Sequence, residues 1–183
     1  LSSAASDVYK RQEIEECGKD PLENARQKAL AYYRICGQPV FSQDSGLYIE
    51  GLPKERQPGV HVRRVNGVNL TDEQMRKYYK KIAAEFGGRC VAQYQNAICL
   101  VFSENEIYEA RGGTLNWKKF WLMTEERPQR MEGFPLDAIC ADYRTGRHFY
   151  DGEATMPEEE GDGVRDFFRN ALKLHEMRNK IEK

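Results

Sequence analysis

Glu16, Lys28 and Asp44 are the residues of the first third of the chain whose types and spacing could do chemistry. A helix between Glu16 and Asp44, packed antiparallel to the strand that follows it, would return the chain so that the two carboxylates meet at one end. Facing carboxylates repel, and such a pair persists when a hard cation such as Mg²⁺ lies between them or when they share a proton. Lys28, Arg63 and Arg64 supply positive charge that could hold phosphate oxygens. The set suits hydrolysis of a phosphoanhydride, where a metal and fixed cations stabilise developing charge; scattered surface charges are the alternative.

The segment that carries Asp44 has a distinctive pattern. A short apolar run, Val40 and Phe41, stops at residues 43–46, and an alternating run over residues 47–49 follows at once. The pattern predicts a strand that ends in a tight glycine turn, and then a returning strand. A carboxylate at the end of a buried strand is held rigidly, and the glycine lets backbone come close to a ligand. The alternative is a purely structural turn, since Asp and Ser cap turns well.

Capping residues mark the predicted helices. Asp20 can cap a helix that has Pro21 at its first position, apolar residues recur at helical spacing, and Gly37 ends it, so we predict a helix over residues 21–36. Thr71-Asp72-Glu73-Gln74 opens a second helix that runs to about residue 86. Apolar spacing predicts a third over residues 164–179.

From Arg89 onward the apolar period changes to two, which is typical of strands. The predicted strands cover residues 90–102, 106–110 and 117–124, and a hairpin pairs residues 139–143 with 147–150. Helices and strands in this order predict an α/β fold (α+β borderline) with helices on the faces of a mixed β-sheet.

Basic side chains crowd the second predicted helix at Arg76, Lys77, Lys80 and Lys81. Nucleic-acid binding would be one use of this charge. We favour a solvated basic face on a helix whose aromatic side joins the core. The whole chain has 28 basic and 29 acidic residues and a net charge of −1, so no nucleic-acid partner is expected.

Length and composition limit the classes of protein. The 183 residues suit one domain with a sizeable core. No apolar run approaches the roughly eighteen residues of a membrane-spanning helix, so no membrane partner is expected. The five cysteines are scattered, without a Cys-x-x-Cys pair, which indicates reduced thiols and a cytoplasmic protein.

The first twelve residues differ from the rest. They lack an initiator Met, a clear apolar period and the apolar centre of a signal peptide. Residues 1–12 resemble translated adapter sequence, and we interpret them as a non-native leader before a single domain over residues 13–183.

Several motifs together resemble the inosine triphosphate pyrophosphatase family. Order and spacing match across residues 15–67, and a weaker match follows at Gly133-Phe134-Pro135-Leu136-Asp137. The resemblance implies a Mg²⁺-dependent hydrolase that converts noncanonical purine nucleoside triphosphates (ITP, dITP and XTP) to the monophosphate and pyrophosphate. It also implies an elongated mixed sheet flanked by helices, two lobes with a cleft between them, and a homodimer. The matching motifs of the first third are Glu15-Glu16-Cys17-Gly18, Leu22-Glu23-Asn24-Ala25, Lys28-Ala29, Pro39-Val40, Asp44-Ser45-Gly46-Leu47 and Pro58-Gly59-Val60.

The resemblance assigns roles to individual residues. Glu16 and Asp44 would be metal ligands, and Asp44 would be the catalytic carboxylate. Phe134 would stack on the base, and Asp137 would read its edge. The remaining expected substrate contacts are Lys28, Ser45, Gly46, Arg63 and Arg64.

This sequence departs from the family pattern at several positions. The family's first strand, with a Gly-Asn loop that cradles phosphate, has no match, so we expect residues 13–183 to lack it. Gln43 stands where the family has an acid, and Leu136 replaces an aromatic. Asp166-Phe167-Phe168 aligns with the family's Ser-His-Arg. These departures favour a rival hypothesis, a catalytically weak or inactive nucleotide-binding protein on the same fold; a plain interaction domain is a second rival. The preferred base and the oligomeric state stay open.

Overall fold

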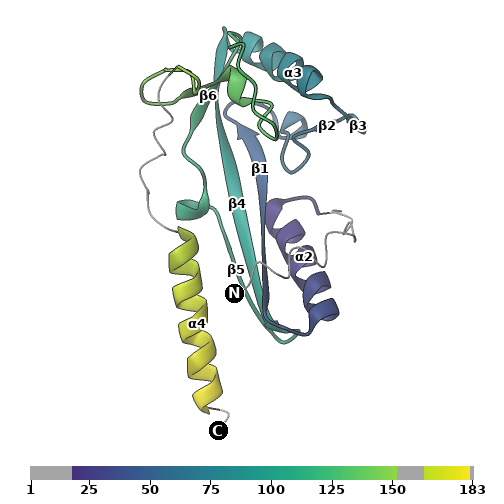
Figure 1. The fold of residues 1–183 in the computed structure, drawn as a ribbon, viewed down its shortest axis with the longest axis vertical. Helices are drawn as coiled ribbons and strands as arrows, with labels where there is room; N and C mark the ends of the chain where they lie inside the picture. Colours follow the sequence, from purple (N-terminus) through teal and green to yellow (C-terminus); the bar gives the residue numbers. More distant parts are fainter. Residues whose placement is uncertain (1–17, 152–162, 182–183) are drawn as a thin grey trace.

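A long β-sheet forms the axis of the molecule. The structure, a computed structural model, describes residues 18–151 and 163–181. Figure 1 shows an elongated molecule in which α2 (Pro21–Cys36) and α4 (Gly163–Ile181) flank the lower part of the sheet on opposite sides. α3 (Asp72–Glu85) lies near the upper end of the sheet.

The helices begin and end where their capping residues stand. The Asp20 carboxylate accepts hydrogen bonds from the backbone N–H groups of Leu22 and Glu23, and Gly37 adopts a left-handed conformation with φ of 62°. Thr71 and Gln74 form a reciprocal capping box at the start of α3. Such side chains satisfy backbone groups that a helix end leaves without partners. The three predicted helices are confirmed as α2, α3 and α4.

β1 (Val40–Ile49) is one uninterrupted strand. The prediction of a glycine turn at residues 43–46 was therefore wrong, and Asp44 lies in the middle of a strand instead of at its end. The physical reason is a long-range contact: Leu47 exchanges two backbone hydrogen bonds with Gly59, at 2.9 and 3.0 Å. A side chain at position 46 would lie 3.0 Å from the Gly59 carbonyl carbon. Gly46 thus permits the close approach of a loop, and it does not form a turn.

β4 (Arg89–Ser103) is the central strand, and β1 pairs with it antiparallel from Val40↔Val101 to Ile49↔Ala92. On the other edge of β4 the partner changes along its length. β5 (Glu106–Arg111) pairs with one half and β6 (Phe120–Met123) with the other. All strand pairs among residues 18–151 and 163–181 are antiparallel, where a mixed sheet was expected, because the neighbours of β4 all run against it.

The segment between β5 and β6 fills the gap beside β4. It contains the short helix η2 (Gly113–Leu115), and its backbone N–H groups at Gly112 and Trp117 donate to the carbonyls of Asn96 and Tyr94. Trp117 therefore lies outside β6, although the sequence predicted it within a strand. Its ring packs edge-on against Tyr94, at 5.7 Å between centroids.

The remaining short elements complete the upper half of the molecule. β7 (Cys140–Asp142) pairs with β6, and a single bridge joins Ala141 to His148, so the predicted hairpin is present in shortened form. The other short elements are η1 (Lys54–Arg56), β2 (Arg64–Val65), β3 (Val68–Asn69) and η3 (Asp137–Ile139).

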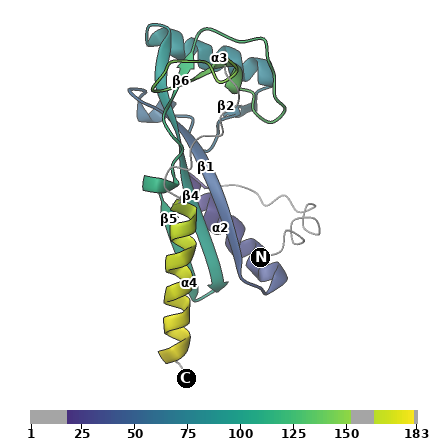
Figure 2. The ribbon, with the colours of Figure 1, turned by 60° about the vertical axis from the view of Figure 1, so that its left-hand side comes forward.

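Two hydrophobic cores lie along the sheet. The larger joins α3, through Tyr79 and Ile82, to Leu47 and Ile49 of β1 and to β6 and β7. The smaller joins Ala25 and Ala29 of α2 to Cys99 and Val101 of β4, with Ile107 packed against it. Figure 2 shows the corresponding upper and lower parts of the molecule. The expected α/β class, with an elongated sheet flanked by helices, is confirmed.

None of the helices within the described residues has the length and apolar character needed to cross a bilayer.

The close approach of Gly59 to Gly46 gives a test of the β1 geometry. An added methyl group at position 46 would lie 3.0 Å from the Gly59 backbone and from the Tyr48 ring. We expect Gly46→Ala to lower the free energy of unfolding by about 1 to 3 kcal/mol, because overpacking forces backbone to shift. Denaturant unfolding would measure it.

Gln43→Ala is the matched control, since this exposed side chain lies on the same strand; it should change stability by less than about 0.5 kcal/mol. An equal effect of the two substitutions would contradict the assigned contact.

Candidate functional site

The Asp44 carboxylate is held at both oxygens by side chains of α2. Lys28 Nζ donates to Oδ1 at 2.9 Å, and Asn24 Nδ2 donates to Oδ2 at 3.0 Å. The Asp44 and Lys28 side chains are only 13% and 19% exposed. A partly buried ion pair with these extra hydrogen bonds has a fixed geometry. The structure thus brings together two of the predicted site residues.

Asn24 is a functional candidate that the sequence analysis missed. It is fully buried, and its Oδ1 accepts a hydrogen bond from the Gly18 backbone N–H at 2.8 Å. A side chain at position 18 would lie 2.3 Å from that oxygen, so Gly18 is required there. Asn24 and Lys28 stand four residues apart, which places both on one helix face. That spacing was the available signal.

Ser45 and Gly46 do not face the same way as Asp44. Successive side chains of a strand point to opposite faces, so Ser45 lies on the face away from α2. Its Oγ donates to Asn96 Oδ1 at 2.8 Å. Gly46 shares the Asp44 side, where its missing side chain makes room for Gly59.

Arg63 and Arg64 were predicted beside Asp44, but their contacts lie elsewhere. Arg63 forms an ion pair with Asp72 of α3 at 2.7 Å and donates to the Leu70 carbonyl at 3.0 Å. Arg64 is an exposed residue of β2. Glu16, the predicted second carboxylate, lies outside the described residues.

Phe134 and Asp137, the predicted base-binding residues, lie in the upper part of the molecule. Phe134 is 49% exposed and lines a cavity of about 400 Å³ between α3 and the segment that follows β6. Asp137 begins η3, and burial raises the pKa of its carboxyl above the ordinary value. A pKa raised by burial is common in binding sites.

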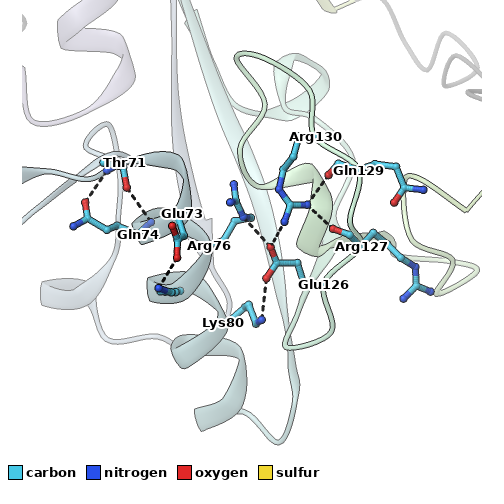
Figure 3. Close-up of polar contacts among 10 residues, drawn as sticks. Thr71, Glu73, Gln74, Arg76, Lys80, Glu126, Arg127, Gln129 and Arg130 are labelled. Carbon is cyan, nitrogen blue, oxygen red and sulfur yellow. Dashed lines mark hydrogen bonds and ion pairs between the residues drawn. The ribbon is translucent and has the colours of Figure 1, made fainter.

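Three basic side chains converge on Glu126 beside this cavity (Figure 3). Arg76 and Arg130 contact Oε1 at 2.9 and 2.7 Å, and Lys80 contacts Oε2 at 3.0 Å. Burial acts to raise the pKa of the Glu126 carboxyl, but the three cations outweigh burial and lower the pKa. The prediction of a solvated basic face was therefore wrong for Arg76, whose side chain is 11% exposed, because its partner is far away in sequence.

A divalent metal has one suitable predicted ligand in the described part of the chain. No group of three or more His, Cys, Asp or Glu side chains gathers there. Mg²⁺, however, is commonly bound by one or two carboxylates, with waters and phosphate oxygens as its other ligands. The hard oxygen donors of Asp44 fit that mode of binding.

Comparison with known proteins gives a consistent result. The model of the Ham1 family matches residues 2–119. A dITP/XTP pyrophosphatase of Brucella melitensis is 31% identical over 160 residues, which cover 81% of this chain and 66% of that protein. A dITP/XTP pyrophosphatase of Geobacter sulfurreducens is 43% identical over 61 residues, 33% of this chain and 30% of that protein. The chain therefore spans less than two thirds of the length of these relatives.

Solved structures show the same fold. A HAM1 protein from Coxiella burnetii superposes with a TM-score of 0.68 at 24% identity, covering 93% of this chain and 84% of that one. The Staphylococcus aureus Ham1 protein gives a TM-score of 0.62 at 22% identity, covering 97% and 85%.

A double-mutant cycle tests the link between Lys28 and Asp44. We expect Lys28→Met, Asp44→Asn and the double variant to give a coupling free energy of about 1 to 3 kcal/mol, because both side chains are mostly buried. Urea unfolding would measure it. The exposed pair Arg34–Glu104, also at 2.9 Å, is the control, and it should couple by less than about 1 kcal/mol. Equal coupling in both pairs would contradict the assignment.

The pKa of Asp137 predicts a pH dependence. A pKa that folding raises means that the folded state holds the proton more tightly, so stability falls as the pH rises through that range. Asp137→Asn removes this loss. The unfolding free energy of the variant minus that of wild type should therefore increase as the pH rises from about 3 to about 7.

Asp142→Asn should do the opposite. The backbone N–H of Thr145 is the main cause that lowers the pKa of Asp142, so its carboxylate stabilises the fold at higher pH and loses this effect as the pH falls. Denaturant unfolding at several pH values would measure both variants. If their unfolding free energies relative to wild type changed with pH in the same direction, the interpretation would be overturned.

Proposed function

The chain belongs to the Ham1 family, whose model matches more than half of its residues, and on that premise we propose that it is a nucleoside triphosphate pyrophosphohydrolase. Its substrates would be noncanonical purine nucleotides (ITP, dITP and XTP), and its products the monophosphate and pyrophosphate. The names of the Brucella and Geobacter relatives support this reaction. The observation that carries it is the Asp44 carboxylate, fixed by Lys28 and Asn24 in the middle of a rigid strand.

The reaction is addition of water across a phosphoanhydride. A water oxygen forms a bond to one of the two phosphorus atoms that flank the anhydride oxygen, the bond from that phosphorus to the oxygen breaks, and the proton leaves the attacking water. Asp44 would orient this water and accept its proton, as a general base does. Lys28, already 2.9 Å from Asp44, would contact the polyphosphate and stabilise its charge.

Mg²⁺ is the proposed cofactor, held by Asp44 and by Glu16. When bound, it would neutralise the polyphosphate and lower the pKa of a ligated water. The hard oxygen donors of Asp44 support this choice over a softer metal.

Further substrate contacts are proposed from their positions. Phe134 would stack on the base and Asp137 would contact its edge, and the cavity beside Phe134 supports this. Arg63 would contact the substrate near its base, and its ion pair with the cavity residue Asp72 supports this. Ser45, Gly46 and Arg64 are proposed as weaker contacts.

We also propose a cytoplasmic homodimer. The cysteines within the described residues are free thiols, as expected in a reducing compartment. α4 exposes several apolar side chains, which suit an interface between copies. They are Leu172, Leu174, Met177 and Ile181.

Pyrophosphate release tests the proposal. We expect Mg²⁺-dependent release from ITP and XTP in preference to GTP and dUTP, and a loss of about a hundredfold or more in Asp44→Asn, because a positioned base contributes that much. Glu104→Gln, a change in an exposed carboxylate, is the control and should keep the wild-type rate. Nucleotide binding without release would support the rival, a nucleotide-binding protein that is weak or inactive as an enzyme. If the protein neither binds nucleotide nor releases pyrophosphate, the remaining hypothesis is a plain interaction domain.

A further inference from the structure

Arg76 has hydrogen-bond donors that no residue in the described part of the chain accepts. Its Nε donates to Glu126 at 2.9 Å, but within the described residues its two terminal nitrogens make no hydrogen bond. A guanidinium carries five N–H donors, so four of them have no acceptor among residues 18–151 and 163–181, and the side chain is 11% exposed. Because Arg76 lines the cavity, a ligand in that cavity is the available acceptor.

Arg130 meets Arg76 at the same carboxylate oxygen. Its Nη2 contacts Glu126 Oε1 at 2.7 Å, and its Nη1 donates to the carbonyls of Arg127 and Gln129. Figure 3 shows Arg76 from α3 and Arg130 from the segment after β6 reaching Glu126 from different directions. These bonds fix both guanidinium groups in place, and Arg130 also lines the cavity.

The charges around the cavity argue against a phosphate as its occupant. The two arginines are matched by two carboxylates that also line it, Asp72 and Glu132. Asp72 is paired with Arg63. The charges of the residues that line the cavity therefore balance, and the cavity suits a neutral ligand that presents hydrogen-bond acceptors to the arginines.

Phe134 indicates that this ligand contains a flat ring. Its ring is half exposed at the cavity wall, while its backbone is held in a turn: Phe134 N–H donates to the Met131 carbonyl at 3.1 Å, and Asp137 N–H to the Phe134 carbonyl at 3.3 Å. An open aromatic face held in position favours stacking with a flat ring. A volume of about 400 Å³ is ample for a purine.

We propose that Arg76 and Arg130 are specificity-determining residues that donate to the O6 and N7 acceptors of an oxopurine stacked on Phe134. The inference rests on the proposed function and names the chemistry by which its site selects a base. Arginine commonly reads this pair of acceptors in a purine. Hypoxanthine and xanthine carry it, whereas adenine has an amino donor in place of O6. Adenine would leave the guanidinium donors unpaired, and such sites reject the wrong ligand strongly. Guanine shares the acceptors, so the arginines separate oxopurines from adenine and do not exclude guanine.

The substitution Arg76→Met tests this selection. We expect the ratio of kcat/KM for ITP to that for ATP to fall by about tenfold or more, through a higher KM for ITP, because one bidentate arginine contact discriminates bases by about that factor. Arg130→Met should act in the same direction. Arg76→Lys keeps the charge, but its ITP/ATP ratio should still fall, because a lysine lacks the planar fork. This variant keeps the proposal testable if Arg76→Met does not fold.

Lys80→Met is the matched control. Lys80 belongs to the same helix and contacts the same carboxylate as Arg76, but it is absent from the cavity lining. Its ITP/ATP ratio should stay within about twofold of wild type. Equal shifts in Lys80→Met and Arg76→Met, or an unchanged ratio in Arg76→Met, would overturn the proposal.

Calorimetric binding of ITP and ATP without added metal separates this inference from the proposed function. If wild type releases no pyrophosphate, the proposed function fails, but preferential ITP binding that Arg76→Met abolishes and Lys80→Met keeps would still support the arginines. Equal binding of ITP and ATP, or no binding of either, would overturn their assigned role.

Discussion

The antiparallel pairing of β1 with β4 is the constraint on which the rest of the structure depends. Its unbroken register puts Asp44 opposite Ala97 on the face that α2 covers, and Leu47 and Ile49 on the other face, in the core shared with α3. Because side chains alternate along a strand, a slip of one residue would turn Asp44 away from Lys28 and put a polar group into the larger core. One ladder of hydrogen bonds therefore positions both the candidate reaction centre and the helix that carries Arg76.

In both candidate regions hydrogen-bond donors surround a carboxylate, and the regions differ in whether any donor remains without an acceptor. Burying a charge is costly unless it is paired and hydrogen-bonded. Lys28 and Asn24 donate to both oxygens of Asp44, so the orientation of that carboxylate is fixed. At Glu126 the donors outnumber the oxygens, and Arg76, a residue of the cavity lining, retains N–H groups that no described residue accepts. Under our proposals the first arrangement serves chemistry on phosphates, and the second serves recognition of the base.

The sequence predicted those features that local interactions determine. Asp20 and Gly37 delimit α2 because caps act within one helical turn, and the residue types of the first motifs indicated Lys28 and Asp44 as site residues. The turn at Gly46 was predicted wrongly because the backbone of Gly59, in the loop after β1, packs against position 46 and requires a glycine there. Arg76 was misjudged for a similar reason: Glu126 lies fifty residues away, and no local pattern indicates such a partner.

Phosphorus-31 NMR of ITP incubated with the protein and Mg²⁺ tests the central claim most directly, because each product has its own resonances. The account predicts that the three triphosphate signals give way to those of a monophosphate and of pyrophosphate. Signals of inosine diphosphate and free phosphate would contradict it, since a different anhydride would then have been cleaved. An unchanged triphosphate spectrum would contradict the assignment of Asp44 to a reaction centre.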